Sequence, residues 1–188
     1  MTWIFDPLPP LKYDLIMADP PWSFKTYSDK GKGKSPDAHY SCMALDDIKA
    51  LPVSQLASRD CILWLWAINP MLDHCIDTLK AWGFTYVTAG SWEKITKHGK
   101  QAFGTGYCLR SSNEPVLIGK IGNPRYANNI RSSFHAQIRE HSRKPDEAYK
   151  QAEALAIGAV HKADLFSRQN RTGWDSWGNE IGKFGEAA

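Results

Sequence analysis

The chain has 188 residues, of which 43% are hydrophobic and 23% charged, and its formal net charge is only +3. A chain of this length should bury about 70% of its unfolded surface, so we expect one domain over residues 1–188 with a substantial core. Because no apolar run has transmembrane length and no signal-peptide pattern stands at the start, we expect a cytoplasmic protein with no membrane partner.

The predicted elements alternate between apolar strands and helices bounded by Pro, Asn or Gly. In chain order they are a strand over 13–18, helices over 45–51 and 52–57, a strand over 61–67, a helix over 70–82, strands over 84–92 and 114–118, a helix over 145–156 and a strand over 161–167. Asn69 is the expected N-cap of the third helix, and an aromatic turn over 174–177 follows the last strand. Strands separated by helices predict an α/β fold with a mostly parallel, doubly wound sheet flanked by helices.

The segment Asp19-Pro20-Pro21-Trp22 directly follows the first strand, and its prolines place it on a loop at the strand's carboxyl end. Asp19 supplies a side-chain acceptor, and Pro21 keeps the carbonyl of Pro20 out of helical geometry, so two oxygens can polarise an amino group such as adenine N6. Trp22 can stack on a base that is flipped out of its duplex. The motif therefore predicts methylation of an exocyclic amine, with Asp19, Pro20, Pro21 and Trp22 as the catalytic residues.

Charge is spread unevenly along the chain. Residues 91–144 hold ten basic and three acidic side chains, whereas the segments before and after this block each carry a net charge of −2. The glycine-rich stretch over 25–40 predicts a basic flap, with Lys30, Lys32 and Lys34 as candidate substrate contacts. Compact domains rarely keep long loops without function, so we expect those over 95–112 and 120–140 to face nucleic acid.

A cofactor site is expected at the last strand. No Gly-x-Gly-x-x-Gly follows the first strand, so the nucleoside of a cofactor such as S-adenosylmethionine must be held elsewhere. Asp164 can accept hydrogen bonds from ribose hydroxyls there, although a solvated strand residue is the plain alternative. Glu114, at the start of a buried strand, is either a substrate-pocket acid or a structural carboxylate.

Metal and disulfide chemistry are not expected. The histidines show no metal-ligand spacing. The cysteines, Cys42, Cys61, Cys75 and Cys108, contain no Cys-x-x-Cys pair, and we expect them to be reduced.

Four blocks together resemble the circularly permuted, DPPW-motif adenine-N6 methyltransferase family that includes the catalytic subunit of the eukaryotic mRNA N6-adenosine methyltransferase. They are Asp19-Pro20-Pro21-Trp22, Ser142-Arg143-Lys144-Pro145-Asp146-Glu147, Asp164-Leu165-Phe166-Ser167-Arg168 and the segment 173–180. The resemblance covers nearly the whole chain and implies a Rossmann-like, S-adenosylmethionine-dependent methyltransferase fold. One departure is Asp164, where the family usually has Glu.

The resemblance also implies site residues. The candidate cofactor contacts are Asp19, Lys144, Asp164, Phe166, Arg168, Asn170, Asn179 and Glu180. Among these, Lys144 would meet the methionine carboxylate and Arg168 the ribose. The candidate substrate contacts are Trp22, Lys30, Lys32, Lys34, Tyr40, Trp92 and Glu114, of which Tyr40 and Trp92 would line the base pocket.

The sequence as a whole predicts direct, metal-independent methyl transfer from S-adenosylmethionine to adenine N6 in DNA, by a monomer or a homodimer. DNA is preferred because a short chain without accessory RNA-binding modules suits a DNA methylase. The alternatives are adenine-N6 methylation of RNA, cytosine-N4 methylation of DNA, and a non-catalytic nucleic-acid-binding subunit.

Overall fold

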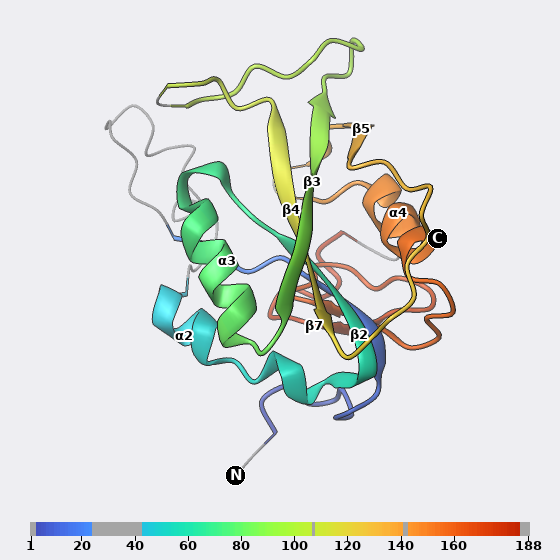
Figure 1. The fold of residues 1–188 in the computed structure, drawn as a ribbon. Coiled ribbons are helices and arrows are strands. Elements are labelled where there is room, and N and C mark those ends of the chain that lie inside the picture. The colour runs from blue at the N-terminus through green and yellow to red at the C-terminus, as the bar shows by residue number, and fades with distance from the viewer. Residues whose placement is uncertain (1–2, 24–42, 107, 141–142, 185–188) are drawn as a thin grey trace.

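The computed structural model describes residues 3–23, 43–106, 108–140 and 143–184. Within these residues seven strands form one sheet in the order β5-β3-β4-β2-β1-β6-β7. The strands are β1 (Tyr13–Ala18), β2 (Ala57–Trp66), β3 (Thr85–Ile95), β4 (Asn113–Ile121), β5 (Ser133–Gln137), β6 (Lys162–Leu165) and β7 (Asp175–Trp177). Figure 1 shows this sheet as the centre of the molecule.

The sheet is mostly parallel, which confirms the predicted α/β class. β1 pairs in parallel with β2 and β6, as do β6 with β7 and β3 with β5, whereas β4 is antiparallel to both of its neighbours. β4 runs the other way because it follows β3 through a loop that carries no crossover helix. The start of β4 therefore lies at the sheet edge where β1, β2, β3 and β6 end, and groups from all of these strands can meet there.

Helices cover both faces of the sheet. α2 (Leu45–Ala50) and α3 (Leu72–Ala81) pack on one face and α4 (Asp146–Leu155) on the other (Figure 1). Strand alternation divides β1 between the two cores, since Ile16 belongs to the core beneath α3 and Met17 to the core beneath α4. Burial on both faces explains why the sequence of β1 is apolar throughout.

Two helix predictions are wrong in their details. The helix expected over 70–82 begins at Leu72, because Asn69–Met71 form a short 3₁₀ turn, η3. Asn69 does not cap the helix; its side-chain amide instead donates to the Asn113 side chain at 3.0 Å. The helix expected over 52–57 is only a 3₁₀ turn, η2 (Val53–Gln55), since β2 already begins at Ala57.

Two short strands were not predicted. β5 lies inside the stretch expected to be a loop over 120–140, and β7 occupies the expected aromatic turn. β5 has a single buried residue, Ala136, and β7 none, so neither shows the apolar pattern that marks a strand. Each forms because its backbone pairs with that of a longer neighbouring strand, β3 for β5 and β6 for β7.

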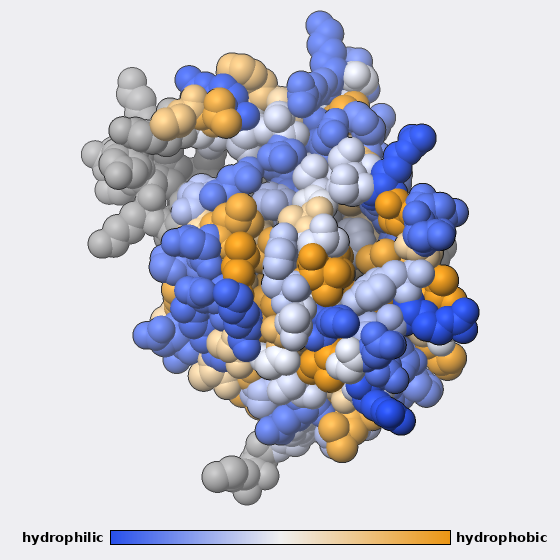
Figure 2. Space-filling view, in the orientation of Figure 1, coloured by the Kyte–Doolittle hydropathy of each residue, from blue (hydrophilic) through white to orange (hydrophobic). Residues whose placement is uncertain are grey.

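The face shown in Figure 2 mixes polar and apolar residues. Among the described residues, none of the helices is long and apolar enough to cross a membrane. Cys61, Cys75 and Cys108 carry free thiols, and Cys42 lies outside the described residues.

Candidate active site

Asp19 lies where the motif predicts, immediately after β1. Its backbone N–H donates to the carbonyl of Leu165 at 3.3 Å, which continues the pairing of β1 with β6 by one residue. The backbone N–H of Trp22 then donates to the carbonyl of Pro20 at 2.8 Å and closes a tight turn. A carbonyl oxygen has two lone pairs, so the Pro20 oxygen keeps one for a further donor.

The Trp22 ring is buried, whereas the motif suggests an accessible ring that stacks on a base. Its side chain is only 3% exposed and packs in the core beneath α3. The indole N–H donates to the carbonyl of Trp66 at 3.1 Å, which ties the loop after β1 to the end of β2. In this structure Trp22 therefore fixes the shape of the loop that carries Asp19.

Four charged side chains gather beside this loop. The ammonium of Lys144 lies 3.1 Å from the Asp19 carboxylate and also donates a short hydrogen bond to Glu114. Glu114 forms a second ion pair with Lys94 at 2.8 Å. Lys144 and Glu114 are 10% and 13% exposed, whereas Asp19 and Lys94 are 25% and 26% exposed, so two carboxylates compensate two ammonium groups at a partly buried site.

The cluster sets the protonation of its members. Burial raises the pKa of Asp19, and the nearby Lys144 only partly offsets that effect. Burial would also raise the pKa of Glu114, but Lys144 and Lys94 outweigh it and lower this pKa to about 2. Glu114 is consequently ionised at neutral pH, and Asp19 is a better proton acceptor than an ordinary aspartate.

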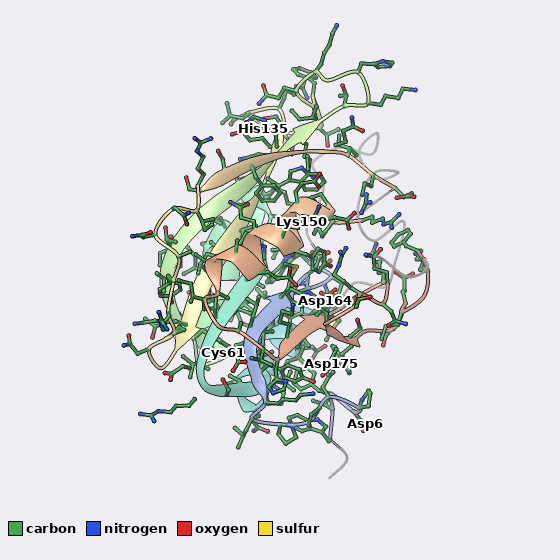
Figure 3. The ribbon with its side chains drawn as sticks, turned by 90° about the vertical axis from the view of Figure 1, so that its right-hand side faces the viewer. Asp6, Cys61, His135, Lys150, Asp164 and Asp175 are labelled. Atoms are coloured by element: carbon green, nitrogen blue, oxygen red, sulfur yellow. The ribbon has the colours of Figure 1, made fainter. Side chains whose placement is uncertain are left out.

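Asp164 stands one residue before the end of β6, pairs with Met17 of β1 and is only 3% exposed (Figure 3). The hydroxyls of Tyr149, from α4, and Ser167 both donate to its Oδ2 atom, each at 2.9 Å. Because both hydroxyls use one oxygen, Oδ1 is left to accept from another group. Burial raises the pKa of Asp164 to about 6 in spite of these hydrogen bonds.

One pocket, partly open to solvent, joins Asp19 to Asp164. Its lining residues are Asp19, Trp66, Arg143, Lys144, Tyr149, Asp164, Phe166, Ser167, Arg168, Gln169 and Phe184. Five of the predicted cofactor contacts are thus brought together: Asp19, Lys144, Asp164, Phe166 and Arg168. Asn170, Asn179 and Glu180 do not line it, although Glu180 pairs with Arg168 at 3.1 Å.

Several lining residues escaped the sequence analysis. Tyr149 reads as an ordinary apolar position of a helix, and only its contact with Asp164 reveals its role. Gln169 is buried and accepts a hydrogen bond from Arg143 at 3.1 Å, while the guanidinium of Arg143 lies 5.3 Å from the ring centre of Phe184. The Arg143 and Ser167 positions did stand in the recognised blocks and could have been inferred from them.

Only some of the predicted substrate contacts lie within the described residues. Lys30, Lys32, Lys34 and Tyr40 lie outside the described residues. Trp92 is buried under the charged cluster, with its indole N–H donating to the carbonyl of Ala136 at 2.9 Å and the Lys94 ammonium 5.0 Å from its ring centre. Among the described residues, no group of three or more His, Cys, Asp or Glu side chains is arranged to hold a metal ion.

Comparison with known proteins agrees with this geometry. The sequence pattern that defines the MT-A70 family matches residues 13–180. The type II methyltransferase M.MunI of Mycoplasma sp is 33% identical over 95% of this chain and 82% of its own length. The MT-A70-like N(6)-adenosine-methyltransferase of Arabidopsis thaliana is 32% identical over 90% of this chain, which is 24% of its own length. The N(6)-adenosine-methyltransferase catalytic subunit METTL3 of Homo sapiens is 28% identical over 90% of this chain, which is 28% of its own length. The chain therefore belongs to the MT-A70 family of N6-adenine methyltransferases.

Proposed function

We propose that this protein transfers a methyl group from S-adenosylmethionine to the N6 amine of adenine in DNA. The observation that carries the proposal is that Asp19 and Asp164 line one pocket, at the ends of two neighbouring parallel strands. An acceptor for the amine thus lies beside groups that suit a nucleoside cofactor. This edge is also where ligands bind in open α/β sheets.

The lining residues fit S-adenosylmethionine. The cations Lys144 and Arg143 suit its carboxylate, and the Oδ1 atom of Asp164 suits a ribose hydroxyl. Phe166 and Phe184 provide apolar rings for adenine. When bound, this cofactor supplies an electrophilic methyl group on a sulfonium centre.

The chain's own residues would prepare the amine. The Asp19 carboxylate would accept a hydrogen bond from one N–H of the amine, and the remaining lone pair of the Pro20 carbonyl would accept the other. Both bonds draw the nitrogen toward tetrahedral geometry, which makes its lone pair available for attack. The nitrogen must lose one proton for each methyl group that it gains. The raised pKa of Asp19 favours transfer of that proton to the Asp19 carboxylate. Ionised Glu114 would keep Lys144 in place throughout.

DNA is the preferred substrate, with RNA as the second candidate. The chain shares most of its length with a type II methyltransferase, whereas it spans about a quarter of the two adenosine methyltransferases compared above. Those two relatives favour RNA as the alternative, because their names specify adenosine. The cytoplasmic location and the monomeric or dimeric state remain predictions.

Mass analysis of nucleosides from cells that express the protein would test this function, with DNA and RNA digested separately. We expect N6-methyladenine in DNA. The same nucleoside in RNA alone would overturn the choice of substrate, N4-methylcytosine would overturn the choice of base, and no new methylated nucleoside in either pool would overturn the activity.

The pKa of Asp164 leads to a pH-dependent prediction. If ionised Asp164 accepts from the ribose, affinity for S-adenosylhomocysteine should fall by up to about tenfold per pH unit below about pH 6 and level off above it. Asp164→Asn should weaken binding and remove this step. Tyr149→Phe should move the step to higher pH, because the Tyr149 hydroxyl favours ionised Asp164 in the parent and its removal raises the pKa of Asp164 further.

Calorimetry across this pH range measures the affinity of the parent, Asp164→Asn and Tyr149→Phe for S-adenosylhomocysteine. A parent affinity that stays constant from neutral pH to well below pH 6 would contradict the assignment. The stability of the cofactor-free protein should show the opposite trend: since folding raises the pKa of Asp164, this group's contribution to stability falls as pH rises from about 4 to about 6.

A further inference from the structure

The described residues of the loop between β3 and β4, 96–106 and 108–112, are called the arm here. Backbone hydrogen bonds run along it, from Ala102 to Lys94 and from Gly104 to Ser111, both at 2.8 Å. At its far end the backbone at Gly106 approaches Leu109 so closely that a Cβ atom on Gly106 would lie 1.9 Å from the carbonyl oxygen of Leu109. Backbone contacts therefore connect the two limbs of the arm.

The arm exposes apolar and basic side chains together. Phe103 and Leu109 are 81% and 85% exposed, more than any other large hydrophobic residue among those the structure describes. The Arg110 guanidinium lies 5.7 Å from the ring centre of Phe103, and Lys97 and Lys100 are also exposed. From Lys94 to Asn113 the sequence has no acidic residue. In Figure 2, apolar and polar residues lie side by side on the loops above β3 and β4.

The base of the arm belongs to the candidate active site. Lys94, near the end of β3, and Glu114, near the start of β4, are the ion pair that continues through Lys144 to Asp19. The arm projects from the sheet edge at which β1 and β6 end (Figure 1). It is thus anchored to the charged cluster that holds Asp19 and extends away from it into solvent.

These features point to a nucleic-acid duplex as the occupant. Methylation of adenine N6 in a duplex requires the base to leave the stack, which opens an apolar gap next to a negatively charged backbone. Proteins that distort DNA often insert Phe or Leu at such steps and place cations on the phosphates beside them. Exposed Phe103 and Leu109 next to Arg110, Lys97 and Lys100 provide both kinds of group.

We propose that the arm grips duplex DNA beside the flipped adenine. Phe103 and Leu109 pack on the bases that flank the gap, while the three cations contact the backbone. This inference rests on the proposed function, since it assumes that the Asp19 pocket receives a base from DNA.

Fluorescence anisotropy with a short labelled DNA duplex that contains adenines tests this grip at several salt concentrations. Phe103→Ala and Leu109→Ala should each weaken binding about fivefold or more with an unchanged salt slope, because the first removes a ring that stacks on a base and the second an apolar side chain that fills the gap. Arg110→Gln should instead flatten the slope of log affinity against log salt by about 0.9. Val160→Ala is the matched control. Val160 is 72% exposed, but it lies where β6 begins, whereas the arm lies at the side of the sheet where β6 ends.

The possible results separate this inference from the proposed function. If the parent methylates adenine in DNA and both alanine variants bind like Val160→Ala, the grip is wrong and the function stands. If the parent neither binds nor methylates the duplex, both are wrong. If the alanine variants change the sedimentation of the protein alone and leave its DNA affinity unchanged, the arm is an interface between copies of this chain, which also overturns the inference.

Discussion

Replacing Asp19 with alanine should lower methyl transfer to adenine at least about tenfold at saturating cofactor, while the protein stays folded. Loss of a hydrogen bond to a charged group costs about 1.5 to 3 kcal/mol, and about 1.4 kcal/mol in the barrier is a factor of ten in rate. Folding should survive because Lys144 keeps Glu114 as its partner. Single-turnover rates with a radiolabelled methyl group, together with thermal unfolding, measure both effects.

Two further variants sharpen this result. Asp19→Asn keeps an acceptor oxygen but cannot take up a proton, so its rate should lie well below that of the parent. Asp47→Ala removes an exposed carboxylate from α2 and should leave the rate unchanged. Transfer by Asp19→Ala within tenfold of the parent would remove Asp19 from the mechanism.

Replacing Glu114 with alanine should destabilise the fold by about 3 to 5 kcal/mol, because Lys94 loses its ion-pair partner and Lys144 the nearer of its two carboxylates, leaving it only Asp19. Denaturant unfolding at neutral pH measures this loss. Glu93→Ala is the control, since Glu93 lies near His135 in a more exposed pair and should matter by less than about 1 kcal/mol.

The loss should also depend on pH in a defined direction. Folding lowers the pKa of Glu114 to about 2, so its contribution is complete above its unfolded pKa of about 4.3 and disappears as pH falls toward 2. The parent and Glu114→Ala should therefore approach each other in stability as the solution is acidified. Equal stability at neutral pH would show that the cluster does not support the fold.

The sequence predicted the parts of the site that are local in the chain. An apolar run ending in Asp-Pro-Pro could only be a strand followed by a loop, and the structure places Asp19 there. Asp164 followed from the same reasoning at the end of β6, and the recognised blocks contributed Lys144 and Arg168. Asp19 and Asp164 meet because β1 and β6 are parallel neighbours that end on the same side of the sheet. Lys144 and Arg168 line the same pocket from the segments before α4 and after β6.

The remainder depends on contacts between distant segments. Nothing near Tyr149 in sequence indicates that its hydroxyl donates to Asp164, and nothing near Trp22 indicates that its ring is buried against β2. Lys144 shows the same effect. From the sequence alone its removal should affect only cofactor binding, but its buried position between Asp19 and Glu114 means that Lys144→Ala should also cost stability.

The central claim is that the pocket between the ends of β1 and β6 binds the cofactor beside the amine acceptor Asp19. A crystal structure of the protein with S-adenosylhomocysteine tests it most directly. We expect density for the ligand in this pocket, with its amino-acid end against Lys144 and its ribose against Asp164. Ligand density outside the pocket, with Asp19 and Asp164 untouched, would contradict the account.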